Sequence, residues 1–223
     1  CQADCAFCPH KKMERAVGVM DLALSNKITD ECVKLGIDYL TIYGFGEPFL
    51  DKYFFDRVRY AKKAGISRVT TNTNAMFMTE EKVSQILNSG LDEIYISFDA
   101  ATPETYKKIR PGLSFETVKS NILNLCKKGG GSKKPEIILS FVESPQNKHE
   151  VTQYLKEWES IVDHVSVSMI HNWTGDVQET GAAIGGFRDP CRLLWTDMVV
   201  SWNGDVPLCC NDYENRIILG NIK

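Results

Sequence analysis

The sequence predicts an α/β fold in which the strands of a parallel β-sheet alternate with helices. Short apolar segments suited to strands recur roughly every 25–40 residues, and amphipathic helical segments separate them. This alternation is typical of βαβ units, whose strands run parallel. The composition agrees, because 223 residues that are 43% hydrophobic and 25% charged suit one compact domain with a small appended module.

Five strands are expected, at residues 38–43, 67–71, 93–98, 137–142 and 165–170. The helices between them begin at residues whose side chains can cap free N–H groups, namely Asp21, Thr79, Thr102 and Ser114, with two more helices at 53–64 and 148–160. A sixth strand is expected before Cys1. We interpret the sequence as the middle of a longer protein, since it lacks an initiating Met and stops at Lys223 without a closing element.

The strand–helix rhythm stops near Asn172, and a different pattern begins near residue 188. Two apolar segments, 197–202 and 205–209, flank Asn203-Gly204, and Asn-Gly between two such segments is a strong hairpin signal. We therefore expect a core over residues 1–187 and the start of a small β-hairpin module over residues 188–223.

Charge and hydropathy narrow the class of protein. No segment approaches the ~20 apolar residues of a membrane helix, and the first residues do not form a signal peptide. A cytoplasmic protein without a membrane partner is therefore expected. The net charge of −3 gives no basic surface for a nucleic-acid partner, which counts against an RNA-modifying enzyme.

Three of the eight cysteines open the chain as Cys1-x3-Cys5-x2-Cys8. Clustered thiols in such a protein indicate metal ligands or catalysts rather than disulfides. Three ligands cannot complete a structural zinc site, which takes four, but they can hold three irons of a cubane and leave the fourth open. The alternative is a zinc knuckle with a distant fourth ligand such as His10.

This spacing, with Phe7 before the third cysteine, resembles the radical S-adenosylmethionine (SAM) superfamily. The resemblance implies a partial (β/α)6 TIM-like barrel, open on one side, whose 4Fe-4S cluster is held by Cys1, Cys5 and Cys8. In that family the open iron binds SAM, and one electron from the cluster splits it into methionine and a 5′-deoxyadenosyl radical. The radical then abstracts hydrogen from a substrate.

Later segments resemble the family's SAM-binding elements. Gly46-Glu47-Pro48 is similar to its Gly-Glu-Pro motif, which implies a contact with the SAM amino group. The strand end Thr71–Asn74 resembles a Thr-Asn-Gly element without its glycine and implies a contact from Asn72.

Two further contacts are implied nearer to the middle of the chain. Ser97 and Asp99 resemble a Ser-x-Asp-Gly segment at the methionyl or ribose portion of SAM, and Arg110 lies in a segment similar to one that supplies an arginine to the SAM carboxylate. A strand-end hydroxyl and a solvated helix-end charge are the alternatives for Ser97 and Arg110.

The second cysteine group, Cys191-x12-Gly204-x4-Cys209, resembles the start of the auxiliary-cluster module SPASM or of its shorter relative Twitch. The resemblance implies one or two further 4Fe-4S clusters with Cys191 and Cys209 among their ligands. Cys210 would point to the opposite face of a strand. Cys32 and Cys126 lie on predicted helix faces with apolar neighbours, as buried structural thiols do.

The resemblance implies an oxidoreductase or maturase that acts on a peptide, a protein or a small molecule and takes electrons from a reductant such as flavodoxin or ferredoxin. His171, Trp173 and Asp176 follow the last predicted strand and are candidates for the substrate pocket. The alternative is a non-catalytic iron–sulfur or zinc-binding electron carrier, which would have no need for Glu47, Ser97 and Arg110.

Overall fold

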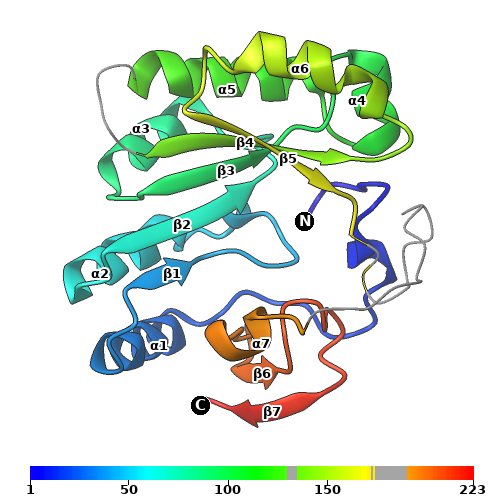
Figure 1. Ribbon diagram of the computed structural model, residues 1–223. Helices are drawn as coiled ribbons and strands as arrows, with labels where there is room; N and C mark the ends of the chain where they lie inside the picture. The colour runs from blue at the N-terminus through cyan, green and yellow to red at the C-terminus, as the bar shows by residue number, and fades with distance from the viewer. Residues whose placement is uncertain (130–134, 172, 174–189) are drawn as a thin grey trace.

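The computed structural model describes residues 1–129, 135–171, 173 and 190–223, and its main element is a five-stranded parallel sheet (Figure 1). The strands pair in the order of the sequence, as in a partial TIM-like barrel. They are β1 Tyr39–Thr41, β2 Arg68–Thr73, β3 Glu93–Ser97, β4 Glu136–Glu143 and β5 His164–Met169. All five predicted strands are therefore present, and the sixth, expected before Cys1, stays a prediction.

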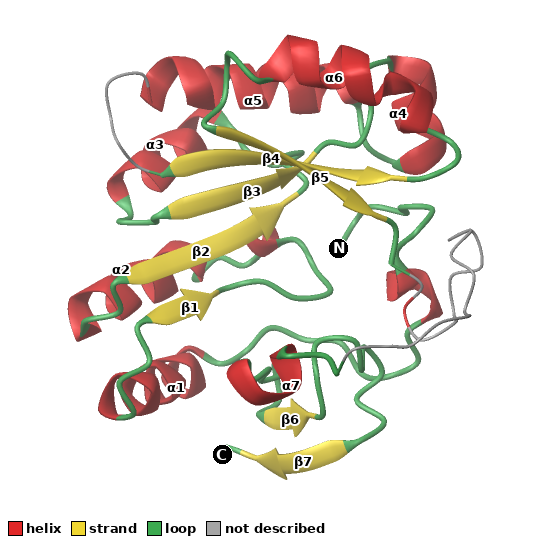
Figure 2. Ribbon diagram, viewed as in Figure 1, coloured by secondary structure: helices red, strands yellow, loops and turns green. Residues whose placement is uncertain are grey.

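Helices connect the strands and cover the outer side of the sheet (Figure 2). They are α1 Leu22–Lys34, α2 Phe54–Ala64, α3 Glu80–Asn88, α4 Pro103–Ile109, α5 Phe115–Gly129 and α6 Val151–Trp158, with short 3₁₀ turns at η1 Pro9–Lys12, η2 Pro48–Leu50 and η3 Lys148–Glu150. The strand arrowheads point toward the N-terminal segment, so the opening cysteines lie at the carboxyl edge of the sheet (Figure 1). In the described part of the chain no helix is long and apolar enough to cross a membrane.

The predicted capping residues set the helix starts. The Asp21 carboxylate accepts hydrogen bonds from the backbone N–H groups of Ala23 and Leu24, and Thr79 accepts from Lys82 N. Thr102 caps α4 in the same way, with Pro103 in the first helical turn. Each cap occupies an N–H group that the helix itself cannot bond, so these local signals determine where the chain leaves each strand-end loop.

The core beneath α4, α5 and α6 is built from aromatic rings. The Phe98 ring lies 5.2 Å from the rings of Tyr106 and Phe115 and 5.6 Å from that of Trp158, and all four side chains are buried. Edge-to-face and offset contacts of this kind stabilise a core beyond the burial of area alone. They fix the end of β3 against α4, and that junction carries two of the predicted site residues.

The C-terminal hairpin differs from the prediction in its strand partner. The turn at Asn203-Gly204 forms, with Gly204 at φ +89° and its N–H bonded to Ser201 O at 2.9 Å. However, β6 Asp205–Pro207 pairs antiparallel with β7 Ile218–Asn221, and its contact with residues 197–202 includes the bond from Ser201 N to Asp205 O at 2.8 Å but no strand ladder. The side chain of Asn221 bonds Asp205 at 2.8 Å, which fixes the register of the β6–β7 pair. A short helix, α7 Leu193–Thr196, precedes the turn and was not expected.

Candidate active site

The loop that carries the first three cysteines is fastened by its backbone to the end of α4. Ala6 N donates to Ile109 O at 2.8 Å and Asp4 N to Pro111 O at 3.2 Å, while Cys8 N donates to Cys5 O at 3.1 Å. Two bonds that flank residue 110 therefore hold the cysteine loop and the Arg110 segment together at the carboxyl edge of the sheet.

The three thiols are free and differ in exposure. Cys1 is exposed, and Cys5 and Cys8 are half-buried. Burial raises the pKa of the Cys5 thiol above its ordinary value, and the Arg110 guanidinium opposes that rise. Burial also raises the pKa of the Cys8 thiol, although a hydrogen bond from the backbone of His10 lowers that pKa in part. Soft thiolates of this kind suit iron–sulfur ligation, in which the metal charge replaces the proton.

The number of thiols in the opening loop fits a cubane with one open iron. In the residues that the structure describes, no group of three or more His, Cys, Asp or Glu side chains converges as one metal ion requires. The ligands of a cubane bind different irons, so their sulfurs need not converge on one point. A set of three thiolates suits a cubane with one open iron, whereas a structural zinc site would need a fourth ligand.

Arg110 is buried, so it is not the solvated helix-end charge of the alternative interpretation. Its Nε donates to the Asp99 carboxylate and its Nη1 to Cys5 Sγ at 3.3 Å, and its guanidinium lies over the Phe7 ring. Burial alone would lower the pKa of Arg110, but Asp99 and then Cys5 outweigh it and the pKa is raised. Arg110 therefore stays charged beside the cysteine loop. Asp99 is fully buried, and Val142 N donates to its other oxygen at 2.7 Å.

The Glu47 carboxylate is also occupied within the protein. It accepts hydrogen bonds from Thr73 Oγ1 at 2.6 Å, Asn74 N at 2.9 Å and Phe49 N at 3.2 Å, and only 5% of Glu47 is exposed. Burial raises its pKa, which the hydrogen bond from Thr73 opposes. Glu47 thus joins the Gly44–Pro48 loop to the end of β2.

Several groups beside the cysteines are open to a ligand. A Cβ added to Gly44 or Gly46 would meet no atom within 4 Å, and neither residue has a left-handed φ, so protein packing does not demand glycine there. The half-buried Ser97 hydroxyl ends β3 and makes no hydrogen bond within the described residues. Gln2 Oε1 is buried and lacks a partner there too. A bound molecule with polar groups would fit these positions.

Asn74 is a site residue that the sequence pattern did not single out. It is buried, its amide donates to Cys1 Sγ at 3.9 Å, and its Oδ1 accepts from Gln2 at 3.1 Å. The predicted residue Asn72 is half-buried within β2 and pairs with Tyr95 across the sheet. Ala75 follows at φ +57°, a conformation in which glycine is favoured, so the chain turns directly after Asn74. Because position 75 is Ala and not Gly, the sequence alone did not mark this turn or the residue before it.

The second module contacts the segment after the cysteine loop. The Glu214 carboxylate accepts hydrogen bonds from Glu14 N and Arg15 N, both at 3.0 Å, and Arg15 Nε donates to Tyr213 O at 2.5 Å. Trp202 Nε1 donates to Ala16 O at 3.1 Å. We call residues 14–18 the docking segment, because these bonds fix the module beside the core.

The remaining cysteines divide between the second module and the core. Cys191 is exposed, and Cys209 and Cys210 are half-buried. Burial raises the pKa of the Cys210 thiol, and the neighbouring Cys209 adds to it. In the core, Cys32 is buried on α1 and Cys126 is half-buried on α5, and both contact the hydrophobic core.

An aromatic cluster lies between the two cysteine groups. Trp173 Nε1 donates to Phe7 O at 2.9 Å, and its ring lies 5.2 Å from Phe45 and 6.5 Å from Tyr213. His171 Nδ1 accepts from Trp173 N at 3.0 Å. The other substrate-side candidate, Asp176, lies outside the described residues.

A parallel sheet with an open three-cysteine loop at its carboxyl edge is typical of barrel proteins that bind a cofactor through an iron–sulfur cluster. Residues 1–157 match the sequence model of the radical SAM superfamily, and residues 191–223 match that of SPASM, an iron–sulfur cluster-binding domain. The chain belongs to the radical SAM superfamily. Its cofactors are accordingly 4Fe-4S clusters and SAM.

Two curated relatives indicate the range of this family. The chain is 28% identical over 158 residues to a tungsten-containing aldehyde ferredoxin oxidoreductase cofactor-modifying protein of Pyrococcus furiosus, covering 69% of this chain and 44% of that protein. It is 25% identical over 204 residues to a GTP 3′,8-cyclase of Limosilactobacillus fermentum, covering 88% and 60%. The chain thus spans about half the length of these relatives.

A solved structure shares the fold. SuiB of Streptococcus suis, bound to its precursor peptide SuiA, superimposes with a TM-score of 0.79 at 14% identity, over 99% of this chain and 60% of SuiB. At this level of identity the likeness shows a shared fold.

Proposed function

We propose that this chain is the catalytic part of a radical SAM oxidoreductase or maturase with an auxiliary cluster. The observation that carries the proposal is the cysteine loop, held at the carboxyl edge of the sheet with a charged arginine on Cys5 Sγ. Open backbone at Gly44 and Gly46 lies on the same edge. An electron carrier needs neither feature.

In this proposal Cys1, Cys5 and Cys8 hold the SAM-binding cluster. When bound and reduced, that cluster would supply the electron for reductive cleavage of SAM. The chain's own groups bind and orient: Gly46 and Pro48 give SAM room on the loop that Glu47 fastens to β2, and Ser97 offers a hydroxyl at the end of β3. The third nitrogen of Arg110, Nη2, makes no hydrogen bond within the described residues and is placed for the SAM carboxylate.

The second module contains the other group of cysteines. We assign Cys191 and Cys209 to an auxiliary 4Fe-4S cluster, with the module over residues 188–223 and the core over residues 1–187. We place the protein in the cytoplasm, with a flavodoxin or ferredoxin as the donor that reduces the SAM-binding cluster.

We infer the substrate class from the solved structure that shares the fold and from the two curated relatives. The precursor peptide bound to SuiB supports a peptide or protein as the substrate of this chain. The names of the cyclase and of the cofactor-modifying protein point to small-molecule substrates among its relatives. His171, beside Trp173 at the same edge, is the described residue that we place on the substrate side.

The test uses the protein that contains this chain, reconstituted with iron and sulfide without oxygen. With SAM and dithionite it should form 5′-deoxyadenosine, measured by mass spectrometry. Cys5→Ala should abolish this product, and Cys209→Ala should retain it while losing part of the bound iron. An intact cluster without any 5′-deoxyadenosine would instead support the electron carrier.

A further inference from the structure

The guanidinium of Arg110 divides its donors between two partners. Nε faces the Asp99 carboxylate, and Nη1 reaches Cys5 Sγ at 3.3 Å. Because a guanidinium is planar and rigid, a carboxylate that fixes one of its edges also fixes the direction of its other nitrogens. The position of Asp99 therefore determines whether Arg110 reaches the Cys5 sulfur.

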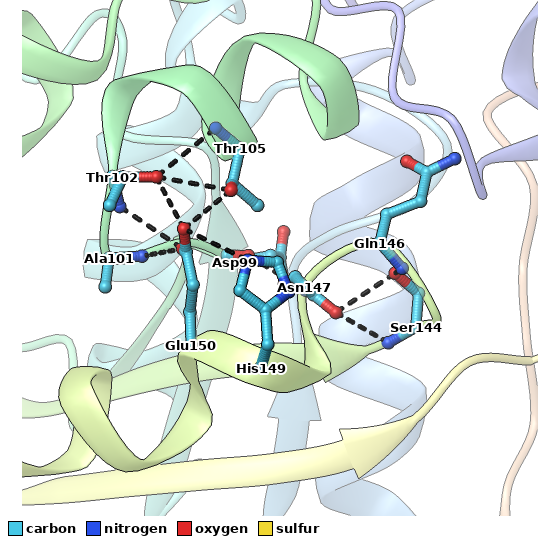
Figure 3. Close-up of polar contacts among 9 residues, drawn as sticks. All are labelled: Asp99, Ala101, Thr102, Thr105, Ser144, Gln146, Asn147, His149 and Glu150. Atoms are coloured by element: carbon cyan, nitrogen blue, oxygen red, sulfur yellow. Dashed lines mark hydrogen bonds and ion pairs between the residues drawn. The ribbon is translucent and has the colours of Figure 1, made fainter.

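Asp99 is held by β4 and by the loop that follows it. Val142 N donates to Asp99 Oδ1 at 2.7 Å, and Asn147 Nδ2 donates to Asp99 O and to Val142 O, both at 2.9 Å. The Asn147 Oδ1 accepts from Ser144 N at 2.7 Å, as Figure 3 shows. Asn147 is fully buried and each of its amide atoms is bonded, so this end of the ion pair has little freedom to move.

The chain between Asp99 and Arg110 is fixed as well. The buried Glu150 carboxylate accepts hydrogen bonds from Ala101 N at 2.6 Å and from Thr105 Oγ1 at 2.6 Å, and it accepts from both the N–H and the hydroxyl of Thr102 (Figure 3). These bonds hold the start of α4, and Arg110 is the residue at which α4 ends. Two buried polar groups from the β4–α6 connection thus hold Asp99 and the start of α4, the helix that leads to Arg110.

We propose that Asp99 is a positioning residue that holds Arg110 against the Cys5 sulfur, and that this N–H···S bond sets the reduction potential of the SAM-binding cluster. The proposal rests on the proposed function, since it requires Cys5 to bind the cluster. Hydrogen bonds and positive charge at a cluster sulfur stabilise the reduced form, which carries one more negative charge, and so raise the potential. Asp99 is fully buried and both of its carboxylate oxygens are bonded within the protein, so in this inference it acts through Arg110.

The first test replaces the donor. The reconstituted Arg110→Gln protein should keep its iron content, and its midpoint potential, followed by electron paramagnetic resonance without SAM, should be more negative than that of the unaltered protein. Arg57→Gln is the matched control, because Arg57 is equally buried and is paired through Nε with Asp51 at 2.9 Å. That variant should lose stability in thermal unfolding and leave the potential unchanged.

The second test separates positioning from charge. In Asp99→Asn the loss of a negative charge would by itself make the potential more positive, whereas an Arg110 that no longer faces Cys5 makes it more negative. We expect the negative shift, and little further shift in the double variant Asp99→Asn/Arg110→Gln. A positive or absent shift in Asp99→Asn would overturn the positioning role, and an unchanged potential in Arg110→Gln would overturn the tuning role.

Different results would refute the proposed function and the role of Asp99 and Arg110. If Cys5 does not bind the cluster, Cys5→Ala retains full iron content and the proposed function falls with this inference. If the protein holds its cluster and forms 5′-deoxyadenosine but Arg110→Gln titrates as the unaltered protein does, the proposed function stands and only the role of Asp99 and Arg110 is refuted.

Discussion

The docking segment carries a glycine that the neighbouring tryptophan requires. A Cβ at Gly18 would lie 2.6 Å from Cδ2 and Cε3 of Trp202 and 2.8 Å from Cζ3. Carbon atoms rest about 3.5–4.0 Å apart, so in Gly18→Ala the indole must retreat by about 1 Å. That movement lengthens the 3.1 Å bond from Trp202 Nε1 to Ala16 O beyond hydrogen-bonding range. Overpacking and the lost bond together should lower the free energy of unfolding by about 2–3 kcal/mol.

Urea unfolding monitored by tryptophan fluorescence measures this change. The control is Gly220→Ala on β7, where a Cβ meets nothing within 4 Å and φ is not left-handed. The control should stay within about 0.5 kcal/mol of the unaltered protein, as surface substitutions do. Equal midpoints and slopes for Gly18→Ala and Gly220→Ala would refute the argument that Trp202 fixes the module on the docking segment.

Three further predictions concern the site. Ala75→Gly should be nearly neutral in urea unfolding, because relief of the φ of +57° offsets the lost methyl group, whereas Ala75→Val should cost about 2 kcal/mol or more; similar values for both would contradict this. Because burial raises the pKa of Glu47 in the folded protein, the protonated carboxyl stabilises the fold at low pH. This stabilisation is lost as pH rises through the pKa of the folded state. As pH rises across the acidic range, the free energy of unfolding should therefore fall less steeply in Glu47→Gln than in the unaltered protein. Parallel pH profiles for the two proteins would contradict this prediction. Trp173→Phe should lose about 1 kcal/mol with the bond to Phe7 O, while Trp173→Leu, which also loses the ring contact with Phe45, should lose more in the same assay.

Local signals explain why the fold was predictable. Asp21, Thr79 and Thr102 cap the helices that the sequence assigned to them, and Gly65 ends α2 at φ +113°. Such residues act through the neighbouring backbone alone, so their effect can be derived without knowledge of the rest of the molecule. The strands between them follow from their apolar composition, and their sequential order follows from the βαβ connection.

The second strand of the hairpin and part of the site depend on contacts distant in sequence. The predicted turn at Asn203-Gly204 is present, but β6 pairs with β7 through bonds that include one from the Asn221 side chain to Asp205. Likewise, Asn74 is singled out by its approach to Cys1, across more than seventy residues of sequence. The buried pairing of Asp99 with Arg110 also depends on tertiary position, so a motif could name both residues but not their contact.

The Glu214 contacts have a consequence for the order in which the protein matures. One carboxylate of the second module caps two free N–H groups of the docking segment, which continues directly from the loop of Cys1, Cys5 and Cys8. Ordering of the module therefore restricts the chain entropy of the residues that follow that loop, and clusters bound at the two proposed sites would favour each other through thermodynamic linkage. With the first three cysteines holding a cluster as proposed, a protein whose second module is unloaded should accordingly bind iron more weakly at that loop.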